Sequence, residues 1–124
     1  MENKEGMVNE LFGAVAQYGL VEVVHKLFGE HAKIKLGFTQ KVCDASIDEI
    51  ALSVRGYNVL KRSNINTLGE LIEMLNEKDI KSLRNLGEKT AREIKSKIIN
   101  YGYESLSEYD KKAFLLEVVE LNTK

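Results

Sequence analysis

The 124-residue chain has no proline, and its apolar residues recur three and four positions apart instead of alternating. Proline interrupts helices and strict alternation marks half-buried strands, whereas spacing of three and four places apolar side chains on one helical face. Both observations favour helices along the whole chain. The sequence therefore predicts the all-α class, built as a compact helical bundle with flanking amphipathic helices.

Composition excludes several other classes of protein. Hydrophobic residues make up 44% of the chain and charged residues 30%, and no apolar run approaches the roughly 20 residues needed to cross a bilayer. The first ten residues mix both charge signs, unlike a secretory signal, and Cys43 is the only cysteine, which excludes an internal disulfide. We expect a cytoplasmic protein without a transmembrane segment.

Three segments of the sequence differ in charge and in capping signals. Residues 1–45 carry five basic and six acidic side chains, residues 46–103 carry ten and eight, and residues 104–124 carry three and five. Only the middle segment is basic, and its excess is too small to identify a partner. We predict an N-terminal helical extension and linker over 1–45, a small domain over 46–103, and a C-terminal helix over 104–124.

Local patterns place the helix ends. Apolar spacing predicts two short helices before Gly29, interrupted at Gly19, and then a linker over residues 31–44. Capping boxes, in which an N-cap hydroxyl and an acidic residue three positions later satisfy free N–H groups, are predicted at Ser46–Glu49, Thr67–Glu70 and Ser105–Glu108. The predicted core of the middle segment consists of Ile50, Val54, Leu60, Ile65, Leu68, Leu71, Ile72, Leu75, Ile80, Leu83, Leu86, Ile94 and Ile98.

Residues 83–94 predict a helix-hairpin-helix motif, with a turn at Gly87 and a second helix that ends at Gly102. Lys89 and Thr90 lie in the first turn of that second helix. The free N–H groups and the dipole at a helix N-terminus attract anions, and glycine lets the backbone approach a phosphate closely. In the plainer interpretation, Gly87 only closes a turn and Lys89 is solvated.

A second polar surface is predicted on the helix over residues 54–62. Arg55, Asn58 and either Lys61 or Arg62 share one helical face, because they are spaced three or four positions apart. The apolar residues of this segment point elsewhere. One face can therefore pack while the other binds a partner.

Three motifs in this order make a family resemblance specific. They are Leu52-Ser-Val-Arg-Gly-Tyr-Asn-Val-Leu-Lys-Arg62, Ile65-Asn-Thr-Leu-Gly-Glu-Leu71 and Arg84-Asn-Leu-Gly-Glu-Lys-Thr90. Together they cover much of residues 46–103, which resemble the C-terminal domain of the bacterial RNA polymerase alpha subunit. The resemblance implies a non-enzymatic transcription domain that binds AT-rich DNA upstream of promoters, with an arginine in the narrow minor groove and the hairpin on the flanking backbone.

The resemblance also implies a set of DNA-binding residues: Arg55, Asn58, Val59, Lys61, Asn85, Gly87, Lys89, Thr90 and Glu93. A narrow A-tract groove concentrates negative potential, so Arg55 would read groove shape more than base identity. The hairpin residues would hold phosphates. Glu93 would orient Arg55, because a bare carboxylate beside phosphate is repelled.

The sequence departs from the family at three points. Ala51 stands where many relatives carry an acidic residue that contacts the sigma factor, and Glu88 stands where relatives often carry a basic residue. The length of the sequence also leaves no room for the domain that assembles polymerase, so we expect no assembly capacity. These departures keep open a rival function, a protein-interaction adaptor that binds a transcription regulator or sigma factor. A third alternative is a homo-oligomer formed through the helices of residues 7–28.

Other kinds of site are not expected. His25 and His31 have no cysteine or third histidine at metal-ligand spacing, so no metal site is predicted. The segment 87–90 lacks the glycine spacing of a nucleotide-binding loop. Acidic residues gather at helix starts, where capping explains them, and no nucleophile and base stand together. We expect neither a cofactor nor enzymatic activity.

Overall fold

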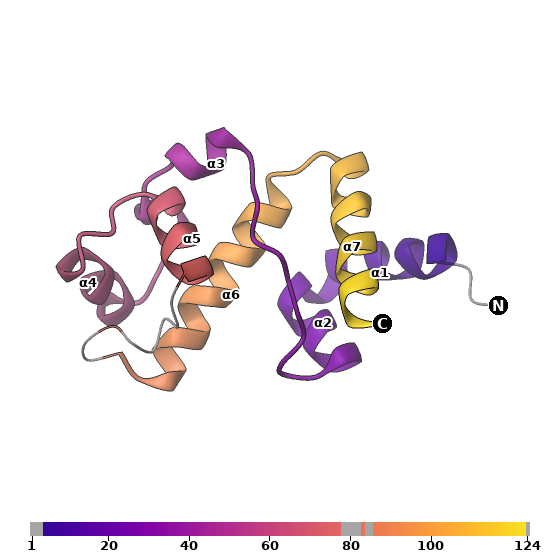
Figure 1. Ribbon diagram of the computed structural model, residues 1–124, viewed down its shortest axis with the longest axis horizontal. Coiled ribbons are helices and arrows are strands. Elements are labelled where there is room, and N and C mark those ends of the chain that lie inside the picture. Colours follow the sequence, from indigo (N-terminus) through magenta and orange to yellow (C-terminus); the bar gives the residue numbers. More distant parts are fainter. Residues whose placement is uncertain (1–3, 78–82, 84–85, 124) are drawn as a thin grey trace. The chain divides into compact units, whose positions relative to one another are not determined.

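A computed structural model describes residues 4–77, 83 and 86–123. Within these residues the protein is helical and has no strand, which confirms the all-α class; Ser46 and Thr67 form one isolated antiparallel bridge. The elements, seen in Figure 1, are α1 (Lys4–Tyr18), α2 (Leu20–Phe28), α3 (Gln40–Asp44), the 3-10 helix η1 (Ile47–Ile50), α4 (Val54–Arg62), α5 (Leu68–Glu77), α6 (Glu88–Glu104) and α7 (Glu108–Asn122). No described helix is long and apolar enough to cross a membrane.

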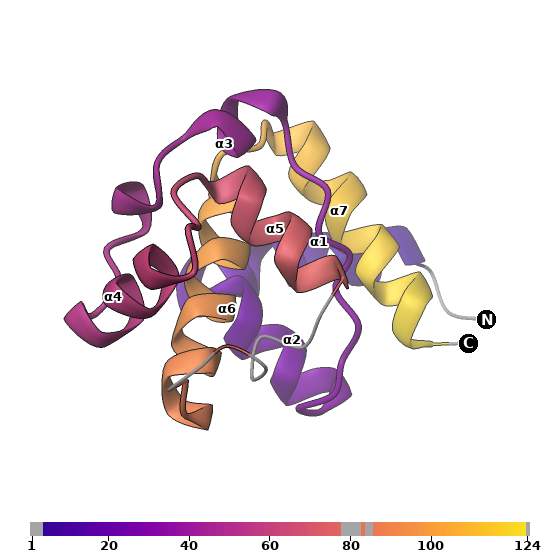
Figure 2. The ribbon, with the colours of Figure 1, turned by 60° about the vertical axis from the view of Figure 1, so that its left-hand side comes forward.

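The protein forms two compact units, residues 36–102 and residues 1–35 with 103–124. In the first of these, α5 lies beside α6 in both views, with α3 at one end of α5 (Figures 1 and 2). Among its described residues, the largest fully buried side chains belong to η1, α4, α5 and α6: Ile47, Leu60, Leu68, Leu71, Ile94 and Ile98. Apolar burial of this kind is the main favourable contribution to folding.

Most of the predicted core is buried, with one clear error. Val54 is 77% exposed. It is the first residue of α4, and because side chains lean toward the helix N-terminus, Val54 extends past the end of the helix instead of packing beneath it. Leu75, Leu83 and Leu86 are half-buried, and Ile80 lies outside the described residues.

The capping box at Thr67 forms as predicted. The Glu70 N–H donates to the Thr67 hydroxyl at 3.1 Å, and Glu70 Oε1 accepts from the N–H groups of Asn66 and Thr67, each at 3.0 Å. These backbone hydrogen bonds, that of Asn66 first, lower the pKa of Glu70 below its usual value of 4.5. The two other predicted boxes differ: Ser46 accepts from the Asp48 N–H and starts only a 3-10 helix, and Ser107, not Ser105, caps α7.

The lowered pKa of Glu70 predicts a pH-dependent contribution to stability. Because the folded-state pKa lies below the unfolded value, the stabilisation is complete above about pH 4.5 and is lost as the pH falls through the folded-state value. Glu70→Gln should therefore lower the free energy of unfolding at pH 7, and the difference from wild type should shrink in acid. Urea unfolding between pH 7 and pH 3 measures this, with Glu73→Gln on the same helix as the control for loss of charge. A difference that does not change with pH would contradict the assignment.

The predicted end of the last middle helix at Gly102 is wrong, because α6 continues to Glu104. Gly102 is buried within the helix, and a Cβ atom there would lie 2.4–2.5 Å from three ring atoms of Phe38. The glycine is therefore needed for close approach of this ring, not for a left-handed helix end. This contact arises in the tertiary structure and leaves no local signal.

The predicted linker over residues 31–44 also includes a helix, α3. The Thr39 hydroxyl caps it, accepting from the Val42 N–H, and α3 packs on α5, where a Cβ atom on Gly69 would lie 2.9 Å from the Cys43 carbonyl oxygen. The Leu68 N–H donates to the Ala45 carbonyl at 2.8 Å. This segment is therefore tied to the start of α5.

The unit of residues 1–35 and 103–124 joins the two ends of the sequence. As predicted, two helices precede Gly29 and are interrupted at Gly19; both glycines have positive φ, +91° and +92° respectively. α1 packs on α2 and α7. The Asn122 amide donates to the Lys33 carbonyl and accepts from the Lys33 N–H, each at 2.8 Å. Burial, and then the nearby Glu104 charge, raises the pKa of Tyr103 to about 12.

Candidate nucleic-acid interface

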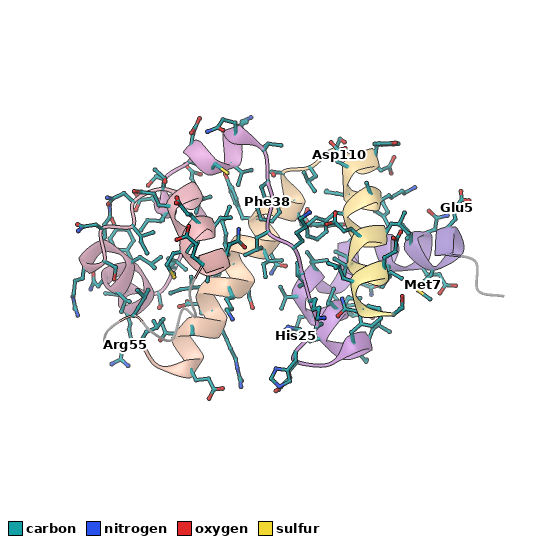
Figure 3. All side chains as sticks on the ribbon, viewed as in Figure 1. Glu5, Met7, His25, Phe38, Arg55 and Asp110 are labelled. Atoms are coloured by element: carbon teal, nitrogen blue, oxygen red, sulfur yellow. The ribbon has the colours of Figure 1, made fainter. Side chains whose placement is uncertain are left out.

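α4 presents polar side chains on its outer face, as the spacing predicted. Ser53 is its N-cap, and its hydroxyl accepts from the Gly56 N–H at 3.2 Å. Arg55 and Asn58 are not buried, and Figure 3 shows the Arg55 side chain projecting away from the helices. Val59 is the exception among the predicted binding residues on this helix: it is only 3% exposed and belongs to the core, so its side chain is not part of an accessible surface.

Lys61 is partly engaged within its own unit. Its ammonium group donates to Asn66 Oδ1 at 2.9 Å and lies 5.5 Å from the centre of the Tyr57 ring. Such a cation over an aromatic face is held weakly at an exposed site. Lys61 is therefore less available to a partner than Arg55.

The first turn of α6 is open to solvent. Gly87 immediately precedes the helix, and its carbonyl accepts from the Ala91 N–H at 3.0 Å. Gly87, Glu88 and Lys89 are exposed, and a Cβ atom on Gly87 would meet no atom of the described part of the chain within 4 Å. The N–H groups of a first helical turn have no partner within the helix, so this end can accept an anion. Asn85 and most of the first helix of the predicted hairpin lie outside the described residues.

Glu93 joins the start of α4 to α6. Its Oε2 accepts from the Ser53 N–H at 3.0 Å and its Oε1 accepts from the Ser53 hydroxyl at 2.7 Å. In the part of the protein that the structure describes, no ion pair links Glu93 to Arg55, so Glu93 does not hold the Arg55 side chain by a direct contact. The reason is that both carboxylate oxygens are taken by Ser53. Thr90, one turn before, places its methyl group 3.5 Å from the position of a Cβ atom on Gly56.

Three contributors to this surface were missed by the sequence analysis. Ser53 is a typical N-cap residue directly before the amphipathic helix α4, and that signal could have identified it. Arg92 forms an ion pair with Glu88 at 3.3 Å, at a spacing of four that was also visible in the sequence. Lys97 donates to the Ala51 carbonyl at 2.7 Å, where Ala51 has a positive φ of 47°, and nothing local predicted this contact.

The Glu88–Arg92 pair changes how the acidic residue in the hairpin is interpreted. Both side chains are well exposed, so the pair adds little to stability. Arg92 nevertheless offsets the negative charge of Glu88 near the start of α6. Among the described residues, no cluster of three histidine, cysteine, aspartate or glutamate side chains is arranged to hold a metal ion.

Comparison with known proteins identifies the family. The family model for the C-terminal domain of the bacterial RNA polymerase alpha chain matches residues 38–100. DNA-directed RNA polymerase subunit alpha of Moorella thermoacetica is 36% identical over 107 residues, covering 73% of this chain and 34% of the relative. The subunits of Desulforamulus reducens (35% over 94 residues, 62% of this chain and 30% of the relative) and Staphylococcus aureus strain Newman (35% over 107 residues, 73% and 34%) are similar.

These relatives are longer proteins, and the chain spans about a third of the length of each one that it matches. No solved structure gives a significant match. The family match extends over half of the sequence and includes α3, α4, α5 and most of α6. The protein therefore belongs to the family of C-terminal domains of the bacterial RNA polymerase alpha subunit, which are non-catalytic.

Proposed function

We propose that this protein is a transcription-associated module that binds AT-rich duplex DNA through the minor groove and the flanking phosphates. The observation that carries the proposal is that Ser53 and Glu93 join the N-terminal turn of α4 to α6, while Arg55 and Lys89 remain exposed. In this arrangement the Arg55 side chain can enter a minor groove, and the nearby N-terminus of α6 can bind phosphate. Its place of action would be the bacterial cytoplasm, where promoters are accessible.

Phosphate binding is assigned to the start of α6. Gly87 and Lys89 are exposed, a Cβ atom on Gly87 would meet no atom of the described residues within 4 Å, and Lys89 adds a positive charge to a helix N-terminus whose dipole favours an anion. Thr90 is half-buried, with its methyl group near Gly56 of α4, and we assign its hydroxyl to the phosphate contact. Asn85 stays a predicted member of this group. None of these contacts distinguishes one base sequence from another.

Preference for AT-rich DNA is assigned to Arg55. Narrow minor grooves of A-tracts concentrate negative potential, which attracts an inserted guanidinium group. Arg55 is exposed, and among the described residues no hydrogen bond or ion pair holds its side chain. Asn58, one turn further along the same outer face, can add hydrogen bonds to the groove edge or the sugar-phosphate backbone.

The charge of the domain predicts weak and salt-sensitive binding. Residues 46–103 carry only two more basic than acidic side chains, and each phosphate neutralised contributes a fixed increment to the salt dependence. Such a domain depends on being linked to other binding partners, since two joined weak sites act at a high effective concentration. Transcription regulators and polymerase are the partners that we propose for this role.

Fluorescence anisotropy with an AT-rich and a GC-rich duplex of equal length tests the function. At low salt, the AT-rich duplex should bind several-fold more tightly, and both affinities should fall steeply between about 50 and 200 mM salt. Equal binding of the two duplexes would contradict groove reading and leave only phosphate contact. If neither duplex binds at low salt, the DNA-binding proposal fails, and the adaptor that binds a regulator or sigma factor becomes the function to test.

A further inference from the structure

We propose that Ser53 and Glu93 are positioning residues that set the placement of Arg55 relative to Lys89, so that one duplex can engage both. This inference rests on the proposed DNA-binding function. Glu93 is half-buried, and it lies one helical turn after Lys89 on α6, while Ser53 lies two residues before Arg55. The Ser53–Glu93 contact is therefore a short connection between the two parts of the surface.

The geometry of the contact restrains Ser53 in two directions. Its N–H and its hydroxyl donate to different oxygens of the same carboxylate, at 3.0 and 2.7 Å. The same hydroxyl accepts from the Gly56 N–H at 3.2 Å. The hydrogen bonds thus run from the first turn of α4 through Ser53 to α6. Because the bonds to the carboxylate are charge-assisted, they are stronger than neutral ones.

Gly56 gives independent support for this arrangement. A Cβ atom on Gly56 would lie 3.1 Å from Glu93 Oε1 and 3.4 Å from Ser53 Oγ, so any larger residue would crowd the carboxylate. Glycine is among the least favourable residues inside a helix, yet Gly56 lies buried in the first turn of α4. Its small size gives the carboxylate room to reach Ser53.

The sign of one mutational effect separates positioning from simple electrostatics. A carboxylate near a phosphate-binding surface repels the ligand, so electrostatics alone predicts that removing its charge strengthens DNA binding. Positioning predicts the opposite. Glu93→Gln retains the size of the side chain but presents an amide that cannot accept from both groups of Ser53. It should loosen the start of α4 relative to α6.

The experiment measures binding of the AT-rich and GC-rich duplexes to variants of the whole protein with Glu93→Gln, Ser53→Ala or Ser53→Thr. We expect Glu93→Gln and Ser53→Ala each to weaken AT-rich binding about tenfold and to bring the two affinities closer together. Ser53→Thr retains the hydroxyl and should bind like wild type. The double variant Ser53→Ala/Glu93→Gln should be no weaker than the weaker single variant, because both changes break one connection.

Controls separate this outcome from misfolding and from failure of the proposed function. Thermal unfolding by circular dichroism establishes that each variant is folded at the binding temperature, and Glu73→Gln on the exposed face of α5 controls for loss of one negative charge. If folded Glu93→Gln binds the AT-rich duplex as tightly as wild type, or more tightly, the positioning role is overturned while DNA binding stands. If wild type binds neither duplex, both proposals fall.

Discussion

Arg55→Ala is expected to weaken binding to the AT-rich duplex by about 10- to 100-fold, which corresponds to roughly 1.4–2.7 kcal/mol. Arg55 is exposed at the start of α4, next to the helix end assigned to phosphate binding. Inside a narrow groove its guanidinium would lie between two phosphate strands, so its loss removes the contact that reads groove width. Anisotropy titrations at low salt measure the effect. The GC-rich affinity should change much less.

Arg62→Ala provides a matched control for Arg55→Ala, because both arginines are exposed on α4 and the two variants lose the same charge. Arg62 lies at the other end of the helix, and its removal should lower the affinities for both duplexes by the same small factor, about twofold, because it removes a charge without removing the groove contact. Arg55→Lys should be intermediate, since lysine retains the charge but lacks the planar fork. Equal losses for Arg55→Ala and Arg62→Ala on both duplexes would show that only overall charge matters.

Leu60→Ala is expected to unfold most of the unit of residues 36–102. Leu60 is 0% exposed, and large-to-small changes at such positions cost about 2–5 kcal/mol through lost burial and a residual cavity. A core in a domain below about 70 residues rarely supplies more than about 3–5 kcal/mol. The substitution therefore removes about as much free energy as the unit has. Urea unfolding followed by circular dichroism measures the loss, and DNA binding should disappear with it.

Leu27→Ala removes the same atoms from an exposed position. Leu27 lies on α2 and is 56% exposed, so its replacement should change the free energy of unfolding by no more than about 0.5 kcal/mol. A Leu60→Ala variant that unfolds at the same urea concentration as Leu27→Ala would mean that the packing around η1, α4, α5 and α6 contributes far less than its burial indicates.

Most of the helices could be predicted because their signals are local. The break at Gly19, the end at Gly29 and the capping box from Thr67 to Glu70 depend on residues within about four positions, and all three formed. The outward placement of Arg55 and Asn58 followed from helical periodicity alone. Val54 shows the limit of that method. Periodicity assigns a residue to one face of a helix, but it does not say where the helix ends or which of its residues a neighbouring helix covers.

The family, too, was determined by the sequence alone, since three motifs in fixed order carried the resemblance that the family match then confirmed. Only the tertiary structure decided the contacts between residues far apart in the sequence. Glu93 and Ser53 are 40 positions apart, and Lys97 and the Ala51 carbonyl are 46 positions apart. The same holds for the contact between Gly102 and the Phe38 ring. There α6 continues past Gly102, the residue at which the sequence predicted the end of the helix. The physical reason is that capping and periodicity act within a helical turn or two, whereas the partner of a carboxylate or a glycine is chosen by the packing of separate helices.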